Sequence, residues 1–152
     1  MINTTLCYLM RDGCVLMLRR DKKENDLNEG KCIGVGGKFE PGESAEQCVR
    51  RETFEETGLT IGRLHFYGII HFRSDTWEDE EMYLFSSDDF SGQLKEDCPE
   101  GELFWVPKDR VMELPLWEGD RLFLRPMLDG RDAIELTLEY EGDELVFWRR
   151  GA

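Results

Sequence analysis

A helix signal over residues 44–58 carries an apolar stripe that ends in glutamate. Ser44 and Gln47 form a capping box and Gly58 supplies a left-handed stop, so a helix of about four turns is predicted between them. At roughly 100° per residue, one face starts apolar and continues into acid, so a fold that packs this face against a sheet brings carboxylates toward its core. The stripe consists of Ala45, Cys48, Val49, Glu52, Glu55 and Glu56.

The three glutamates of this stripe repel one another. Like charges three or four residues apart on a helix cost roughly 0.3 kcal/mol per exposed pair, and more when partly buried. A bound divalent cation would remove the repulsion, and oxygen-only ligands favour a hard ion such as Mg2+ or Mn2+. The alternative is an ordinary solvated face, because glutamate is a good helix former and charged helix surfaces are common.

The segment before the helix favours the metal interpretation. Residues 34–38 are glycine-rich, and a Pro-Gly turn at 41–42 leads directly to the helix start. Such tight backbone can offer carbonyl oxygens to a metal and can approach a polyanion closely. The sequence therefore predicts a metal-phosphate site where the loop meets the helix.

Residues 37–59 resemble the Nudix box, whose pattern is glycine, five residues, glutamate, seven residues, then R-E-U-x-E-E-x-G-U with U aliphatic. Thr53 stands where an aliphatic residue is usual, which bears on local packing more than on chemistry. The resemblance extends to the MutT-like nucleoside triphosphate pyrophosphohydrolases through GVGGK before the box and WEGD after it. The matching fixed positions are Gly37, Glu43, Arg51, Glu52, Glu55, Glu56 and Gly58.

The order of strand and helix signals predicts a mixed α/β protein, and we expect one domain over residues 1–152. The resemblance implies an α/β/α sandwich around a mixed central sheet, and the residues at the end of the chain predict an additional antiparallel hairpin. The predicted strands are 3–10, 14–20, 32–35, 64–72, 81–86, 103–106, 133–140 and 145–148; the second helix is 117–128, with Pro126 near its end, and polar or acidic loops cover 21–31 and 88–101.

Composition limits the class of protein. The apolar runs are short for a membrane span and the N-terminal residues lack a signal-peptide pattern, so we expect a cytoplasmic protein. Five cysteines without a C-x-x-C pair indicate reduced, buried thiols rather than disulfides or a zinc site. A net charge of -14 argues against binding duplex nucleic acid but leaves a magnesium-bound nucleotide possible as substrate. Either a monomer or a homodimer is compatible with the sequence.

The resemblance to MutT-like enzymes implies roles for the acidic residues. It assigns Glu52, Glu55 and Glu56 as ligands of Mg2+ or Mn2+, with one of them also acting as the base, and adds the Gly36 carbonyl as a further ligand. We expect Glu52 to be the base. Glu100 matches a position where such enzymes place another acidic ligand or base; its alternative is a solvated loop acid.

Four further residues, all charged, are expected near the acids. Arg51 would orient Glu43 or a ligand glutamate through a forked contact. Lys38 and Arg20 are predicted to neutralise phosphate; each has the alternative of a plain surface cation.

Two residues of the WEGD segment are candidates for base recognition. Trp117 and Asp120 resemble positions where purine triphosphate enzymes of this group stack and hydrogen-bond the base, and a carboxylate acceptor suits a guanine edge. The alternative for Trp117 is a buried tryptophan at a helix start. Ile33 stands where some oxidised-purine hydrolases have an asparagine that reads the base, and isoleucine cannot do so.

Three functions follow as hypotheses. The first is Mg2+-dependent hydrolysis of a nucleoside triphosphate, such as the oxidised purine nucleotide 8-oxo-dGTP, to monophosphate and pyrophosphate. The second is hydrolysis of another linked diphosphate, such as a dinucleoside polyphosphate, a nucleotide sugar or an RNA 5' end. The third is a nonenzymatic nucleotide sensor, which the intact box acids argue against.

Overall fold

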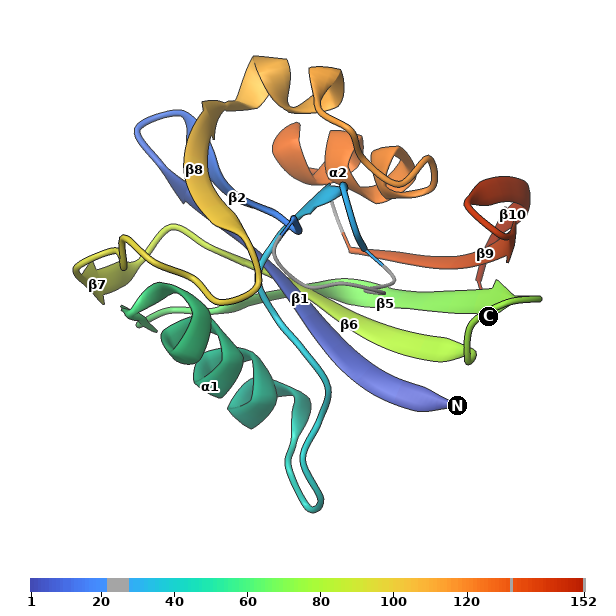
Figure 1. Ribbon diagram of the computed structural model, residues 1–152, viewed down its shortest axis with the longest axis horizontal. Helices are drawn as coiled ribbons and strands as arrows, with labels where there is room; N and C mark the ends of the chain where they lie inside the picture. Colours follow the sequence, from blue (N-terminus) through green and yellow to red (C-terminus); the bar gives the residue numbers. More distant parts are fainter. Residues whose placement is uncertain (22–27, 132, 152) are drawn as a thin grey trace.

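A mixed sheet with one α-helix against each face forms the body of the molecule (Figure 1). The computed structural model describes residues 1–21, 28–131 and 133–151. The elements in chain order are β1 (Ile2–Arg11), β2 (Cys14–Arg19), β3 (Cys32–Ile33), α1 (Ala45–Thr57), β4 (Leu59–Ile61), β5 (His65–Ser74), β6 (Glu80–Ser87), β7 (Phe90–Gly92), β8 (Glu102–Pro107), the 3-10 helix η1 (Lys108–Glu113), α2 (Asp120–Leu128), β9 (Ile134–Glu141) and β10 (Glu144–Arg150).

Strand order in the main sheet is β10-β9-β5-β6-β1-β2-β3, with β8 paired to β2. The pairs β1–β6 and β5–β9 are parallel, whereas the remaining pairs of this sheet are antiparallel. A small second sheet joins β4 and β7. The predicted α/β class, with a mixed sheet and a terminal antiparallel hairpin, is confirmed, and that hairpin extends the main sheet through β9.

The β1–β2 hairpin separates soon after its turn, and this separation makes room for the glycine loop. Only Met10 and Arg11 of β1 pair with β2. The strand β8 pairs with β2 along its whole length. Farther from the turn, β2 pairs with β3 at Leu18 and Arg19, and the segment 35–38 lies beside β1. There the Thr5 N–H donates to the Gly37 carbonyl at 2.9 Å, and Cys7 exchanges two backbone hydrogen bonds with Val35. The sheet therefore holds the loop in place at the point where α1 begins.

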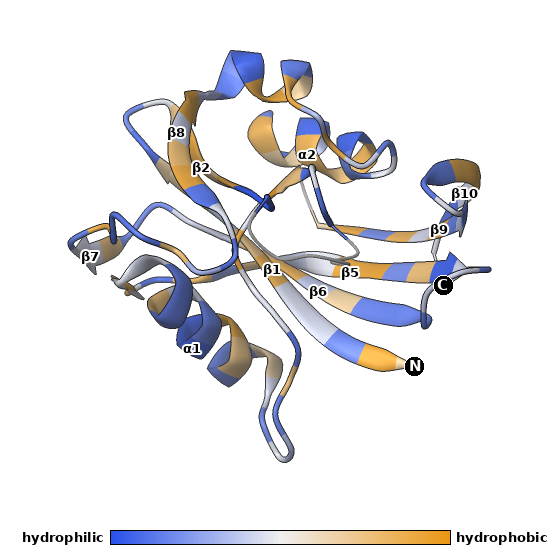
Figure 2. Cartoon of the chain, in the orientation of Figure 1, coloured by the Kyte–Doolittle hydropathy of each residue, from blue (hydrophilic) through white to orange (hydrophobic). Residues whose placement is uncertain are grey.

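Two buried clusters lie on opposite sides of the sheet, as the alternation of β1 requires. Leu6 and Tyr8 join the cluster under α2, whereas Cys7 and Leu9 join the cluster under α1. Figure 2 shows α1 coloured hydrophilic over most of its surface, so its buried stripe is narrow. Four of the five cysteines are buried and all five are free, as predicted, although Cys14 is partly exposed.

Both ends of α1 match the prediction. Ser44 accepts a hydrogen bond from the Gln47 N–H at 3.1 Å, and the Gln47 side chain accepts from the Ser44 N–H at 2.9 Å. Gly58 ends the helix with φ of 80°. Thr53 is fully buried, and its hydroxyl has no hydrogen-bond partner among the described residues. It therefore occupies the aliphatic position of the box as a packing residue.

Several predicted boundaries were wrong. The second helix starts at Asp120 rather than at residue 117, because residues 117–119 form a turn before it. The acidic loop 88–101 contains β7, which is too short to show alternation, and β4 and η1 were also missed. The predicted polar loop 21–31 lies partly outside the described residues, since 22–27 are not among them. Of the helices in the described ranges, none has the length and apolar character needed to span a bilayer.

Candidate active site

A cavity of about 610 Å³ joins the glycine loop to the start of α2. This volume is typical of small-molecule sites. We call one side of the cavity the acid end; it is formed by Gly36, Gly37, Glu52 and Glu100, with Glu56 behind Gly36. We call the other side the aromatic end; it is formed by Phe72, Trp77, Glu80, Trp117, Asp120 and Tyr140.

Two glycines let the loop approach its neighbours at the acid end. Gly36 has φ of 153°, and a Cβ there would lie 2.0 Å from the Thr5 carbonyl oxygen. A Cβ on Gly37 would lie 2.5 Å from the Glu52 carboxyl carbon. Gly36 is therefore a position that only glycine can occupy, whereas a side chain at Gly37 would push the Glu52 carboxylate aside.

Glu56 is the most buried acid of the box, with 6% of its surface exposed. Its Oε1 accepts a hydrogen bond from the Gly36 N–H at 2.8 Å, while its buried Oε2 has no hydrogen-bond partner among the described residues. Burial raises the pKa of this carboxyl to about 8, and the negative charges of Glu100 and Glu52 act in the same direction. Such an uncompensated carboxyl is costly unless a cation accompanies it.

Arg51 gathers the other acids of the box. Its Nε and Nη2 contact the two carboxylate oxygens of Glu43 at 2.7 and 2.9 Å, which is the predicted forked contact. Its Nη1 contacts Glu52 at 2.7 Å. The Arg51 hydrogen bond holds the pKa of Glu43 down at about 2, so this carboxylate stays ionised. The guanidinium therefore holds the carboxylates of Glu43 and Glu52 in place.

Glu52 and Glu55 differ in burial. Glu52 lines the cavity, and burial raises its pKa despite the Arg51 contact. The prediction that Glu55 lies on a buried stripe was wrong, because 56% of its side chain is exposed and it contacts Arg51 at 3.3 Å. The buried face drifts around the helix axis along α1. In the last turns the buried residues are therefore Thr53, Glu56 and Thr57.

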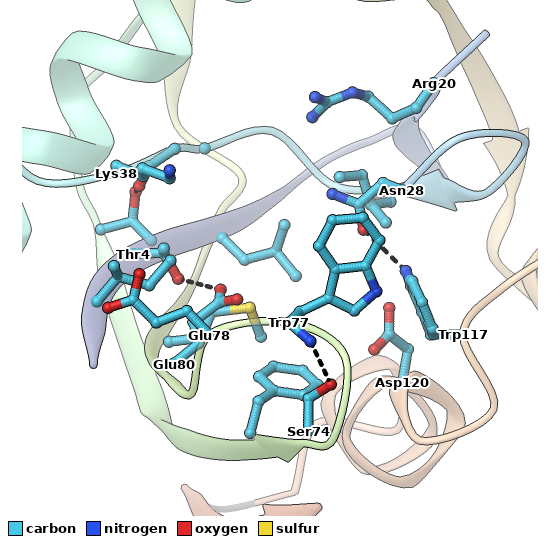
Figure 3. Close-up of a pocket in the computed structure, with 18 of the residues that line it drawn as sticks. Thr4, Arg20, Asn28, Lys38, Ser74, Trp77, Glu78, Glu80, Trp117 and Asp120 are labelled. Carbon is cyan, nitrogen blue, oxygen red and sulfur yellow. Dashed lines mark hydrogen bonds between the residues drawn. The ribbon is translucent and has the colours of Figure 1, made fainter. Parts of the chain in front are cut away.

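The predicted phosphate cations lie along the same cavity. Arg20 is buried and pairs with Glu100 at 3.3 Å, and both residues line the cavity beside Glu52. Lys38 is exposed at the cavity wall. Figure 3 shows Arg20 and Lys38 on opposite sides of the view, with the cavity between them. The structure thus brings both cations and the loop acid to the glutamate face.

Trp117 and Asp120 both line the aromatic end. The Trp117 Nε1 donates to Asn28 Oδ1 at 2.8 Å, and its ring packs edge-on against Tyr140 at 5.3 Å. Asp120 is 3% exposed, and no described residue donates a hydrogen bond to its carboxyl in the structure. Burial, followed by the charge of Glu80, raises the pKa of Asp120 to about 8. Ile33 lies in the same wall.

Sequence reasoning missed the residues that β1, β5, β6, β9 and the turn after β5 contribute to this end. Glu80 is the most informative of them, because it shares a strand face with Met82 and Leu84, two core residues. That alternation was visible in the sequence and could have marked Glu80 as inward-facing. The missed cavity residues include Thr4, Phe72, Trp77, Glu80 and Tyr140.

The acid end fits a hard divalent cation. Its donors are all oxygens, Glu56 has an orphaned buried oxygen, and the glycines leave the loop carbonyls close to the helix. As placed, no three acidic, histidine or cysteine side chains in the described parts of the chain converge as a ligand set. Glu52 Oε1 instead contacts Arg51 at 2.7 Å.

Comparison with known proteins agrees with this geometry. The NUDIX domain family matches residues 2–126. The chain belongs to the Nudix family. An oxidized purine nucleoside triphosphate hydrolase from Danio rerio is 34% identical over 93% of this chain and 88% of its own. The uncharacterized Nudix hydrolase YvcI of Bacillus subtilis is 31% identical over 95% of this chain and 91% of its own.

Solved structures give the same assignment for this Nudix hydrolase. The MutT protein from Bacillus halodurans superposes with a TM-score of 0.89 at 30% identity, covering 99% of this chain and 97% of that chain. A MutT protein from Methanosarcina mazei has a TM-score of 0.72 at 28% identity, covering 85% of this chain and 93% of that chain. The β9–β10 hairpin lies beyond the residues matched by the family but within the extent of the Bacillus halodurans superposition.

Proposed function

We propose that this Nudix hydrolase cleaves a purine nucleoside triphosphate, with 8-oxo-dGTP as the leading candidate, to the monophosphate and pyrophosphate. The observation that carries the proposal is the continuity of the cavity, which joins the glutamate face of α1 to Trp117 and Asp120. A nucleotide needs both ends, because its phosphates and its base lie at opposite ends of the molecule. The named activity of the Danio rerio relative supports the same substrate class.

Mg2+, or Mn2+, is the cofactor that the acid end suits. Glu52, Glu55 and Glu56 would hold it, together with the Gly36 carbonyl and Glu100. The ion would supply charge neutralisation of phosphate oxygens and acidification of water. Of these side chains Glu55 is the most exposed, and one of its oxygens contacts Arg51 at 3.3 Å.

The protein's own residues position the water and the phosphates. Glu52 is the proposed base: its carboxylate lies against Gly37 at the cavity wall and would accept the proton of the attacking water. Water adds to a phosphorus atom, the phosphoanhydride P–O bond breaks, and the bridging oxygen leaves with pyrophosphate. Arg51 holds Glu52 and Glu43 in place and acts as a positioning residue.

The cations and the aromatic end complete the proposed site. Arg20 and Lys38 would balance phosphate charge that the divalent ion leaves uncompensated. Trp117 would stack on the base, and Asp120 would accept hydrogen bonds from a purine edge. Ile33 contributes only apolar contact, so selection among purines falls to the polar residues around it.

The test is a nucleotide panel assayed with Mg2+, using wild type, Glu52→Gln and Glu56→Gln. Each variant replaces a proposed metal ligand or base by glutamine, which has nearly the same size and shape as glutamate. We expect turnover to fall about 100-fold or more. The matched control is Glu46→Gln, an exposed residue of the first helical turn, which should retain wild-type turnover. Pyrophosphate, rather than orthophosphate, is the expected second product.

Undiminished turnover in both glutamine variants would overturn the assignment of the acid end. Release of orthophosphate would show cleavage at a different bond. A wild-type preference for dinucleoside polyphosphates or nucleotide sugars over every purine triphosphate would replace the proposed substrate class while leaving the acid end intact.

A further inference from the structure

A second carboxyl, that of Glu80, faces Asp120 across the aromatic end. Glu80 begins β6, where its backbone lies between Ile2 of β1 and Phe72 of β5. This central place in the sheet fixes the backbone, and strand alternation directs the side chain to the same face as Met82. Figure 3 shows the Glu80 and Asp120 side chains on two sides of the cavity, with Trp77 between them in this view.

One carboxylate oxygen of Glu80 accepts a hydrogen bond from the protein, and the other is available to accept one from a ligand. The Thr4 hydroxyl donates to Glu80 Oε2 at 2.5 Å. No described residue donates to Oε1, and Glu80 lines the cavity. Burial raises the pKa of Glu80, although the Thr4 hydrogen bond and the positive charge of Lys38 act in the opposite direction. Thr4 thus holds a hydrogen-bond acceptor at the cavity wall.

Asp120 supplies independent evidence that a ligand belongs here. Its carboxyl is 3% exposed, receives no hydrogen bond from a described residue, and lines the same cavity. Glu80 acts electrostatically on Asp120, so the two acids share one environment. A buried acid beside a half-buried one, with no mutual compensation, is unfavourable unless a ligand donates hydrogen bonds to them.

We propose that Glu80 is a second base-reading residue, which together with Asp120 selects purines that present N–H donors on two edges. The inference rests on the proposed function and specifies how the aromatic end recognises its substrate. Guanine has donors on its Watson–Crick edge only, and its N7 on the other edge is an acceptor. In 8-oxoguanine N7 carries a hydrogen and becomes a donor.

An acceptor opposite N7 therefore separates these two bases. The carboxylate of Glu80 would accept from N7–H of 8-oxoguanine but would meet the lone pair of N7 in guanine. Because the site is buried, the mismatched pair leaves both groups without a hydrogen-bond partner. A site built around such a bond discriminates by about 10- to 100-fold per charged hydrogen bond.

The experiment measures kcat/KM for 8-oxo-dGTP and dGTP in wild type, Glu80→Leu and Glu80→Gln. Wild type should prefer 8-oxo-dGTP by about 10-fold or more, and Glu80→Leu should bring the ratio to within about threefold of one by losing activity on 8-oxo-dGTP. Glutamine can donate as well as accept, so Glu80→Gln should lower the ratio by gaining activity on dGTP. Glu46→Gln, a change at an exposed acid of α1 outside the cavity, should leave the ratio unchanged.

Equilibrium binding of 8-oxo-dGMP and dGMP, followed by tryptophan fluorescence, provides a second measurement that does not need turnover. If Glu80→Leu fails to fold, the isosteric Glu80→Gln decides the question in both assays. If the Glu80 variants keep the wild-type ratio of kcat/KM for 8-oxo-dGTP to that for dGTP, the inference is overturned and the proposed function still stands. If the wild-type protein hydrolyses neither 8-oxo-dGTP nor dGTP, both the inference and the proposed function are overturned.

Discussion

The acid end and the aromatic end of the cavity are built in different ways. The acid end comes from nearly continuous chain, the glycine loop and α1, with Glu100 added from the loop before β8. The aromatic end collects side chains from β1, β5, β6, α2 and β9. The reaction is therefore encoded in local spacing, whereas selection among substrates depends on the order of strands in the sheet.

Backbone contacts also distinguish the two ends. At the acid end, Gly36 donates to Glu56 and Gly37 touches Glu52, so changing either glycine displaces the chemistry. At the aromatic end, contacts such as Thr4 to Glu80 and Trp117 to Asn28 join side chains. Side chains can be exchanged while the backbone stays in place, so we expect the aromatic end to tolerate substitution better.

The largest effect beyond the glutamate variants should come from Arg51→Lys. Lysine keeps the charge but cannot make the forked contact with Glu43, so Glu52 loses its orientation. We expect kcat to fall about 10- to 100-fold with KM nearly unchanged. Steady-state kinetics on one purine triphosphate measures kcat and KM separately.

The matched control for this change is Arg50→Lys. Arg50 is the preceding helix residue, and it contacts Glu46 and the carbonyls of Ile61 and Gly62, away from the cavity. Equal losses in both variants would mean that Arg51 acts only through helix stability, and the acid end would lose its positioning residue.

Trp117→Ala should produce the next largest effect, a rise in KM rather than a fall in kcat. Loss of stacking raises KM for purine triphosphates by about 10-fold, while hydrolysis of a small polyphosphate without a base is spared. Since Trp117 also packs on Tyr140, circular dichroism must show that the variant is folded. An unchanged purine KM would remove Trp117 from the base site; Trp148→Ala, a change on exposed β10, is the control.

The smallest effect concerns stability rather than rate. The pKa of Asp120 rises from 3.8 to about 8 in the folded protein, so its protonated form stabilises the fold. This contribution is fully present below about pH 4 and is lost as the pH rises through about 8. Wild-type Tm without metal should therefore fall between pH 6 and about 8 and level off above it, and Asp120→Asn should flatten the fall.

Asp109→Asn serves as the control for this titration, because Asp109 is exposed on η1. Part of the slope should persist in Asp120→Asn, since Glu56 also has a raised pKa and contributes with the same sign. A Tm that rises with pH in wild type would contradict the burial of both acids.

Sequence prediction succeeded where the signal was local. The capping box of α1, the turn between β1 and β2, and the forked contact between Arg51 and Glu43 each depend on residues a few positions apart. Glu55 was misplaced because the buried face of a helix drifts around it, and only packing against the sheet shows which side of the last turn is covered.

Prediction failed where the fold brings distant strands together. Glu80 and Thr4 lie far apart in the sequence, and their contact depends on the parallel pairing of β1 with β6. The strands β4 and β7 have three residues each, too few for alternation to be recognised. The start of α2 was placed early because Trp117 continues the apolar pattern of the helix without belonging to it.

Binding of 8-oxo-dGMP to wild type and Glu56→Gln, compared with turnover of 8-oxo-dGTP by the same two proteins, tests the division between the two ends most directly. The division predicts affinities for the monophosphate within about twofold of each other and a loss of turnover of about 100-fold or more in the variant. A parallel loss of affinity and turnover would contradict it, because the acid end would then also be holding the base.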